Sequence, residues 1–175
     1  MKQSDEIKLN VGCGTDYRTG FINIDGSFAL PKVDKTIDIS KESLRHFFAA
    51  DSIDYILAND IVEHHYHWEA ISLLKDFYLI LKVGAIAEIR VPDAQWIIKS
   101  WRMSIEEKLV LLFGGQDNPQ GFNLDMTESR KRFPQFFCHK FGWTANMMKR
   151  ELTGIGFSDV QTRRAGTNFV AIARK

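Results

Sequence analysis

Short apolar segments, each followed at once by glycine or a polar residue, recur along the chain and limit the folds open to it. They span residues 8–11, 21–24, 33–39, 53–58 and 85–91. Between them, residues 67–82 carry apolar side chains at spacings of three and four, as a helix packed against a sheet does. Strand-like segments that alternate with helical ones predict parallel strands connected by helices.

Further helices are predicted at residues 40–49, 94–112 and 144–153, and two closing strands at 157–163 and 168–174. Ser40 is placed to cap the first of these helices, and Gly84 to end the helix at 67–82. Glu88 and Arg90 share one face of their strand, which predicts a partly open or paired environment. No linker divides the chain, so we expect residues 1–175 to form a single domain. The expected fold is α/β, with a Rossmann-like, doubly wound, mostly parallel sheet of about seven strands and an antiparallel C-terminal strand.

The charges nearly cancel, with 23 Lys and Arg against 22 Asp and Glu, so nothing requires a polyanionic partner. The basic residues within 129–150 are interpreted as a solvated face in preference to a nucleic-acid surface. The two cysteines, Cys13 and Cys138, form neither a disulfide framework nor a zinc-type spacing. The polar N-terminus lacks a secretory apolar region, and no apolar run approaches the roughly 18 residues of a membrane span. These features predict a cytoplasmic protein that does not associate with membranes.

A glycine turn with the sequence N-V-G-C-G-T occupies residues 10–15, and Asp25 closes the next strand. In an open parallel sheet the ligand crevice lies beyond the C-terminal strand ends, where a carboxylate can accept both hydroxyls of a ribose. The dinucleotide fingerprint requires a third glycine and a helix N-terminus for the pyrophosphate. Asp16-Tyr17 stand where that glycine would come, and Asp25 follows too soon for a full helix. The short connection therefore favours S-adenosylmethionine, which has no pyrophosphate, over NAD.

The chain resembles the class I S-adenosylmethionine-dependent methyltransferases, specifically the methyltransferase type 11-like group. The matching stretches are LNVGCGTDYRTGFINID (9–25), Asp38-Ile39, DSIDYILANDIVEH (51–64), LILKVGAIAEIRVPD (79–93) and GWTANMMKRELTGIGFSDV (142–160). The chain departs from the group in two places. The usual L-K-P-G-G turn reads LKVGA at 81–85, and the helix after the glycine turn is absent or vestigial.

The resemblance implies a cofactor, S-adenosyl-L-methionine, held by the glycine turn and by the acids after the second and third strands. The implied cofactor-binding residues are Asn10, Gly12, Cys13, Gly14, Asp25, Gly26, Asp38, Ile39 and Asn59. It also matches the pair Glu63-His64 to a signature at the edge of the active site. A histidine with a pKa of about 6.5 can take an acceptor proton at neutral pH, so His64 and Asp60 are the candidate catalytic residues. The alternative is that Glu63 and His64 only brace the loop.

Residues 113–142 are predicted to be irregular, and their length favours a lid or acceptor-binding loop. Glu63, Gln116 and His139 are the candidate acceptor residues. Alternatively, Gly114-Gly115 is a helix stop and His139 a surface residue. No metal site is expected, because His64, His65 and His67 do not share a helical face.

The expected function is methyl transfer to a small-molecule or sugar-type acceptor, with the oligomeric state left open. Two alternatives remain at this point. One is a nucleic-acid methyltransferase that uses the basic 129–150 segment, and the other is a non-catalytic cofactor- or partner-binding protein of the same fold.

Overall fold

A seven-stranded sheet organises the computed structural model, which describes residues 6–121 and 123–175. The spatial order of the strands is β3-β2-β1-β4-β5-β7-β6. Their bounds are β1 (Lys8–Val11), β2 (Ile22–Asp25), β3 (Lys35–Thr36), β4 (Ile53–Asn59), β5 (Leu81–Pro92), β6 (Ser158–Ala165) and β7 (Asn168–Arg174). All neighbours pair in parallel except β7, which is antiparallel to both β5 and β6. The predicted fold class is confirmed.

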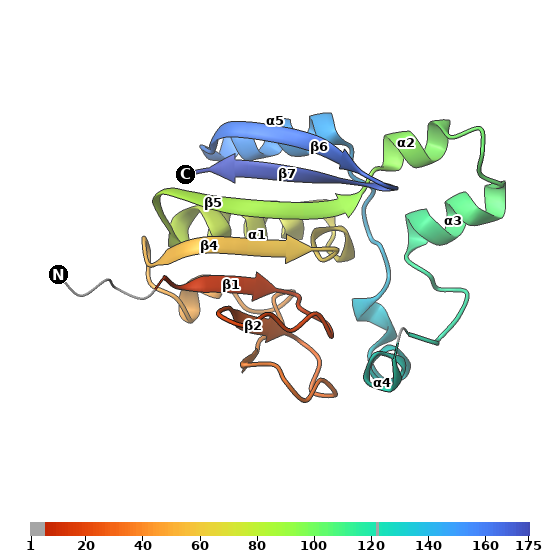
Figure 1. Ribbon diagram of the computed structural model, residues 1–175, viewed down its shortest axis with the longest axis horizontal. Coiled ribbons are helices and arrows are strands. Elements are labelled where there is room, and N and C mark those ends of the chain that lie inside the picture. The colour runs from red at the N-terminus through yellow and green to blue at the C-terminus, as the bar shows by residue number, and fades with distance from the viewer. Residues whose placement is uncertain (1–5, 122) are drawn as a thin grey trace.

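Helices lie behind the sheet and past the ends of its strands (Figure 1). The α-helices are α1 (His67–Ile80), α2 (Ala94–Lys99), α3 (Ile105–Phe113), α4 (Leu124–Arg132) and α5 (Ala145–Ile155). Three short 3-10 helices are η1 (Leu44–His46), η2 (Val62–His64) and η3 (Pro134–Phe136). In Figure 1, α1 and α5 lie behind the strands, whereas α2, α3 and α4 lie past the ends at which β4 and β5 finish. None of the described helices is long and apolar enough to cross a bilayer.

The apolar stripe of α1 packs on the back of the sheet and forms the core with it. Leu74, Phe77 and Ile80 of this helix are fully buried, together with Ile56 of β4 and Ile89 of β5. Each fully buried side chain of this size contributes about 1.5–3 kcal/mol to folding. The periodicity at 67–82 therefore identified the helix correctly, because it was the pattern of the buried face.

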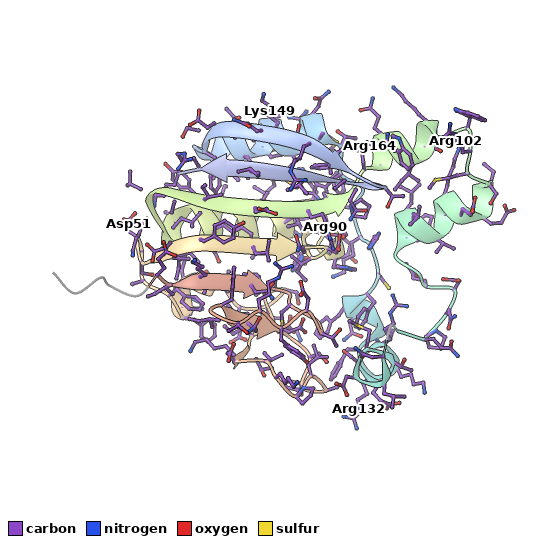
Figure 2. All side chains as sticks on the ribbon, in the orientation of Figure 1. Asp51, Arg90, Arg102, Arg132, Lys149 and Arg164 are labelled. Atoms are coloured by element: carbon purple, nitrogen blue, oxygen red, sulfur yellow. The ribbon has the colours of Figure 1, made fainter. Side chains whose placement is uncertain are left out.

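The opposite face of the sheet, in front in Figure 1, is covered mainly by its own polar side chains, which Figure 2 displays. Glu88 accepts a hydrogen bond of 2.7 Å from the hydroxyl of Tyr55, and Lys82 donates to Asp54 at 2.7 Å. Arg90 forms an ion pair with Asp60 near the ends of β4 and β5. The paired environment predicted for Glu88 and Arg90 is confirmed, since a sheet face that meets solvent carries polar residues.

The third strand and the helix expected after it are much shorter than predicted. Only Lys35 and Thr36 pair with β2, where Val33 to Ile39 was expected, because Ile37 leaves the strand and is buried. Ser40 does not begin a helix, since its hydroxyl donates to Asp38. Within 40–49 the structure forms only η1, which Ser43 caps.

Helix boundaries also differ between the sequence prediction and the structure. The helix predicted at 94–112 is two helices, because Ser104 accepts from the amide of Glu107 and starts α3 anew. The segment predicted to be irregular contains α4, which Asn123 caps by accepting from Met126 at 2.9 Å. Helix α4 escaped prediction because it has no apolar stripe and buries only Ser129. Gly84 does not end α1 but lies within β5 with a φ of 84°.

Candidate functional site

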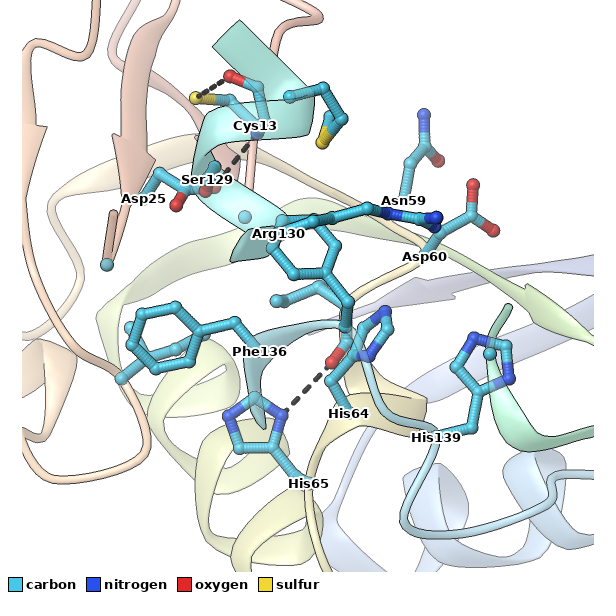
Figure 3. Close-up of a pocket in the computed structure, with 18 of the residues that line it drawn as sticks. Cys13, Asp25, Asn59, Asp60, His64, His65, Ser129, Arg130, Phe136 and His139 are labelled. Atoms are coloured by element: carbon cyan, nitrogen blue, oxygen red, sulfur yellow. Dashed lines mark hydrogen bonds between the residues drawn. The ribbon is translucent and has the colours of Figure 1, made fainter. Parts of the chain in front are cut away.

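A cavity of about 600 Å³ lies beyond the C-terminal ends of β1, β2 and β4 (Figure 3). Residues 12–16, 24–26 and 59–61, which lie at or just after the ends of these three strands, form one side of it. Side chains from α4 and η3, among them Met126, Arg130 and Phe136, line it as well. The cavity therefore occupies the position where open α/β sheets bind their ligands.

The glycine turn after β1 is held against the end of β2 by Asp25. The Asp25 carboxylate accepts from the amide of Gly14 and from the amide of Ser27, each at 2.9 Å, through different oxygens. Each carboxylate oxygen can accept a further hydrogen bond, so Asp25 keeps acceptor capacity for a ligand. Burial raises the pKa of Asp25 above its ordinary value, while the amides of Ser27 and Gly14 oppose the rise.

Glycine is needed at position 12 for a structural reason that is separate from ligand binding. Its φ is 67°, and a Cβ added there would lie 2.4 Å from Cγ1 of Ile61. Glycine at this position therefore allows the loop after β4 to close against the turn after β1. Cys13 is 5% exposed, and burial followed by the charge of Asp25 raises the pKa of its thiol to about 12.

Asp38 lies on the cavity wall with its oxygens already engaged. One oxygen accepts from the hydroxyl of Ser40 at 2.5 Å, and the other pairs with the ammonium of Lys41 at 2.8 Å. Burial raises the pKa of Asp38, but Lys41 and Ser40 outweigh that effect and hold it below the ordinary value.

Asp60 follows β4 in a left-handed conformation with a φ of 53°. Its carboxylate forms an ion pair with Arg90 and accepts from the side-chain amide of Asn168 at 2.7 Å. These contacts fix Asp60 in place between β5 and β7. Asp60 therefore makes a structural contribution to this end of the sheet.

Backbone hydrogen bonds bring residues 138–141 against η2. The carbonyl of Glu63 accepts from the amide of Lys140 at 2.8 Å, and Nδ1 of His64 lies 3.1 Å from the carbonyl oxygen of Cys138. The rings of His64 and His139 then meet edge to face with 4.9 Å between their centroids. Figure 3 shows the two imidazoles side by side at the cavity.

Burial dominates the protonation of this cluster. It lowers the pKa of His64 to about 3, with His139 adding to the effect, so the imidazole of His64 is neutral at physiological pH. Burial also lowers the pKa of His139. The pKa of Glu63 is raised well above its ordinary value, first by burial and then by the charge of Asp60.

Most of the residues selected from the sequence meet at this cavity. Those that line it are Asn10, Gly12, Cys13, Gly14, Asp25, Gly26, Asp38, Ile39, Asn59, Asp60, His64 and His139. Glu63 is 2% exposed and is not among the lining residues, although its carboxylate approaches His139. Gln116 is exposed, and its side-chain amide donates to the carbonyl of Phe113 at 2.6 Å. Gln116 therefore lies at the end of α3 and does not line the cavity, where it was expected to contact the acceptor.

Sequence reasoning missed the contribution of α4 and η3 to the cavity. Arg130 was grouped with the solvated basic residues, yet its side chain lines the cavity and donates to the carbonyl oxygens of Asn118 and Gln120. Phe136 of η3 also lines the cavity. The only signal in the sequence was a basic run followed by aromatic residues, which does not say which side chains turn inward.

The remaining basic residues do not form one continuous surface. Figure 2 places Arg132 near α4 and Lys149 on α5, at opposite sides of the molecule. Both side chains are exposed, whereas Arg130 is half-buried. The exposure of Arg132 and Lys149 agrees with the interpretation of these basic residues as solvated, although the two lie on different faces and not on one.

The sequence matches no family model and no curated protein. Solved structures do match it. A SAM-dependent methyltransferase from Archaeoglobus fulgidus aligns with a TM-score of 0.64 at 14% identity, over 97% of this chain and 86% of that one. A SAM-dependent methyltransferase from Methanosarcina mazei aligns with a TM-score of 0.63 at 18% identity, over 99% of this chain and 93% of that one.

A third match is 1,6-didemethyltoxoflavin-N1-methyltransferase from Burkholderia thailandensis, solved with bound 1,6-didemethyltoxoflavin and S-adenosylhomocysteine. It aligns with a TM-score of 0.60 at 14% identity, over 97% of this chain and 70% of that one. Three further matches are longer proteins, of which this chain spans 49–62%. The agreement extends over 97–99% of this chain in these three matches. The protein therefore has the fold of the class I S-adenosylmethionine-dependent methyltransferases.

Proposed function

We propose that the protein is an S-adenosylmethionine-dependent methyltransferase that acts on a small-molecule acceptor. The observation that carries the proposal is the placement of Asp25. Its carboxylate borders a cavity of about 600 Å³ beside the glycine turn and keeps acceptor capacity on both oxygens. This is the chemistry required to hold the two hydroxyls of a ribose.

The other residues around the cavity fit the same cofactor. Leu30, Ile37 and Phe136 provide apolar walls suited to an adenine ring. A Cβ at Gly26 would meet Phe136 at 3.4 Å and narrow the space between them. Gly14, with a φ of 53°, places no side chain between the backbone and the cavity beside Asp25. The methionine part of the cofactor would lie there. When bound, S-adenosylmethionine supplies an electrophilic methyl group.

The acceptor site is proposed to lie toward His64 and His139, where residues 114–142 form a lid. A hydrogen bond between the hydroxyls of Ser27 and Ser129 ties α4 to the loop after β2, and both residues are buried. A closed lid excludes water and holds the acceptor near the methyl donor, and such positioning provides much of the acceleration in bimolecular transfers. The Nδ1 atom of His64 is engaged by Cys138, so its Nε2 atom is the one available to the acceptor site.

A small acceptor is favoured over a nucleic acid because the cavity lies beneath α4 and η3 and the exposed basic residues lie on different faces. The non-catalytic alternative is a protein of the same fold that binds the cofactor or a partner but transfers no methyl group.

The test is calorimetric titration of the protein with S-adenosylhomocysteine and, separately, with NAD. We expect S-adenosylhomocysteine to bind with one-to-one stoichiometry and NAD not to bind. Binding of NAD alone would refute the cofactor assignment. Transfer of labelled methyl from S-adenosylmethionine to a panel of small alcohols, phenols, amines and thiols then separates an enzyme from a binding protein. Binding without transfer to any of them would favour the non-catalytic alternative.

A further inference from the structure

We propose that Glu63, His64 and His139 form a binding site for one divalent transition-metal ion. One carboxylate oxygen and one nitrogen from each histidine all lie within 4.8 Å of one another. Nε2 of His139 lies 3.9 Å from a carboxylate oxygen of Glu63. Donors about 2.1 Å from a zinc ion stand roughly 3.4 Å apart in tetrahedral geometry, so binding draws the side chains together by about an ångström.

The orientation of both imidazoles fits metal ligands. Nδ1 of His64 lies 3.1 Å from the carbonyl oxygen of Cys138, and Nδ1 of His139 lies 3.0 Å from that of Leu111. A carbonyl oxygen only accepts, so each Nδ1 carries the proton and each Nε2 keeps its lone pair. Metal-binding histidines are commonly fixed in this way, with the second ring nitrogen donating to a backbone carbonyl.

Glu63 supplies an independent observation. Its side chain is 2% exposed, and neither carboxylate oxygen has a hydrogen-bond partner among residues 6–121 and 123–175. An unpartnered carboxylate in such a place is costly, and buried charges in proteins are usually paired or coordinate metals. A cation between Glu63 and the two histidines would satisfy this group.

Three parts of the chain hold the cluster together. Helix η2 provides Glu63 and His64, and the 138–141 segment provides His139. The end of α3 approaches closely because Gly114 has no side chain. A Cβ at Gly114 would lie 2.5 Å from the carbonyl oxygen of Phe137 and 2.7 Å from the ring of His139. The arrangement is thus built by backbone contacts and does not depend on mobile surface side chains.

The donor set indicates which ions would bind. Two imidazoles and one carboxylate suit Zn²⁺, Fe²⁺ and similar ions, whereas Mg²⁺ and Ca²⁺ prefer oxygen ligands alone. His64 and His139 line the cavity while Glu63 does not, so the free coordination positions face the cavity. On the proposed function, an oxygen of the acceptor would occupy them, next to the methyl donor. That role rests on the proposed function, but the binding of the ion does not.

The site replaces the expectation that the protein has no metal site. That expectation considered only the neighbouring residues His64, His65 and His67. The structure instead joins His64 to His139, and His65 is turned aside with Nδ1 lying 3.0 Å from the carbonyl oxygen of Ile61.

The experiment uses the full chain without a polyhistidine tag, stripped of metal with a chelator and titrated with Co²⁺ in the absence of S-adenosylmethionine. We expect one Co²⁺ per chain, a visible absorption typical of nitrogen and oxygen ligands, and displacement by Zn²⁺. Glu63→Gln and His139→Ala should each weaken binding by about tenfold or more. Glu42→Gln and His46→Ala, at exposed positions outside the cluster, are the matched controls and should bind as the unaltered protein does.

Circular dichroism and thermal unfolding establish that each variant folds. If Glu63→Gln does not fold, His139→Ala carries the test. The proposal is overturned if the unaltered protein binds no stoichiometric Co²⁺, or if the folded cluster variants bind it as well as the two controls. Titration with S-adenosylhomocysteine is performed separately. Binding of Co²⁺ without the nucleoside would refute the proposed function and leave the metal site standing, whereas the reverse result would refute the metal site alone.

Discussion

The hydroxyls of Ser27 and Ser129 lie 2.7 Å apart and join the loop after β2 to α4 across 102 residues of sequence. Both serines are buried, at 1% and 0% exposure, although the rest of α4 is polar and largely exposed. A buried hydroxyl pair is stabilising only while both partners are present. The pair therefore identifies the contact that would hold residues 114–142 closed over the cavity.

Replacing Ser129 with alanine should loosen this segment while leaving the sheet intact. The lost hydrogen bond is expected to cost about 1 kcal/mol, because the hydroxyl of Ser27 loses its partner. Limited proteolysis should then cut within 114–142 faster than in the unaltered protein, and S-adenosylhomocysteine should restore protection. Ser158→Ala, an exposed serine on β6, is the control. Equal cleavage rates in the unaltered protein, Ser129→Ala and Ser158→Ala would show that the hydrogen bond between Ser27 and Ser129 does not hold a lid closed.

Asp25→Ala should weaken the binding of S-adenosylhomocysteine far more than it lowers stability. A hydrogen bond to a charged group contributes about 1.5–3 kcal/mol, which corresponds to roughly a 10- to 150-fold loss of affinity. Titration calorimetry measures the change, with the exposed Asp117→Ala as the control.

Asp25 also accepts from the amides of Gly14 and Ser27, so the thermal stability of the variant without ligand must be measured beside its affinity. Unchanged affinity would remove Asp25 from the cofactor site. Asp38 would then be the acid to test next, despite its engagement by Ser40 and Lys41.

Most of the strand segments along the chain and the position of α1 could be predicted, because both leave periodic or repeated patterns in the sequence. Leu74 and Phe77 repeat with the helical period since they face the sheet. Helix α4 leaves no such pattern, because it buries Ser129 and otherwise meets solvent or the cavity. The break between α2 and α3 depends on a single capping residue, Ser104, and apolar residues recur on both sides of it in the sequence.

Some residues of the candidate site could likewise be identified from the sequence, and others could not. Asp25 and the glycine turn could be found because they follow strands, and the ends of parallel strands meet at one edge. Arg130 could not be found, since a basic residue on a polar helix gives no sign of which way it turns. The contact between His64 and His139 depends on backbone hydrogen bonds between residues far apart in sequence, such as that from Lys140 to Glu63. Such a meeting requires the three-dimensional path of the chain.

Gln116 and His139 should behave differently when each is replaced by alanine. Gln116 is exposed and donates to the carbonyl of Phe113 at the end of α3, so Gln116→Ala should leave methyl transfer and the affinity for S-adenosylhomocysteine close to those of the unaltered protein. His139 lines the cavity against His64, so His139→Ala should reduce transfer while cofactor affinity changes little. The rate of labelled methyl transfer with an acceptor identified from the panel separates the two. Loss of transfer in Gln116→Ala alone would contradict this placement.

The two thiols should differ in their reactivity toward a disulfide reagent at pH 8. Cys13 is 5% exposed, and burial, aided by the charge of Asp25, raises its pKa to about 12, so almost none of it is thiolate at that pH. Cys138 is partly exposed, and its thiol donates a hydrogen bond to the carbonyl of Pro134. We expect one thiol to react quickly and the second to react only when denaturant opens the glycine turn. Cys138→Ser should abolish the fast reaction, and raising the pH from 7 to 9 should leave Cys13 protected. Rapid labelling of Cys13 in the native protein would mean that the turn after β1 opens readily, and its assignment to the cofactor site would lose support.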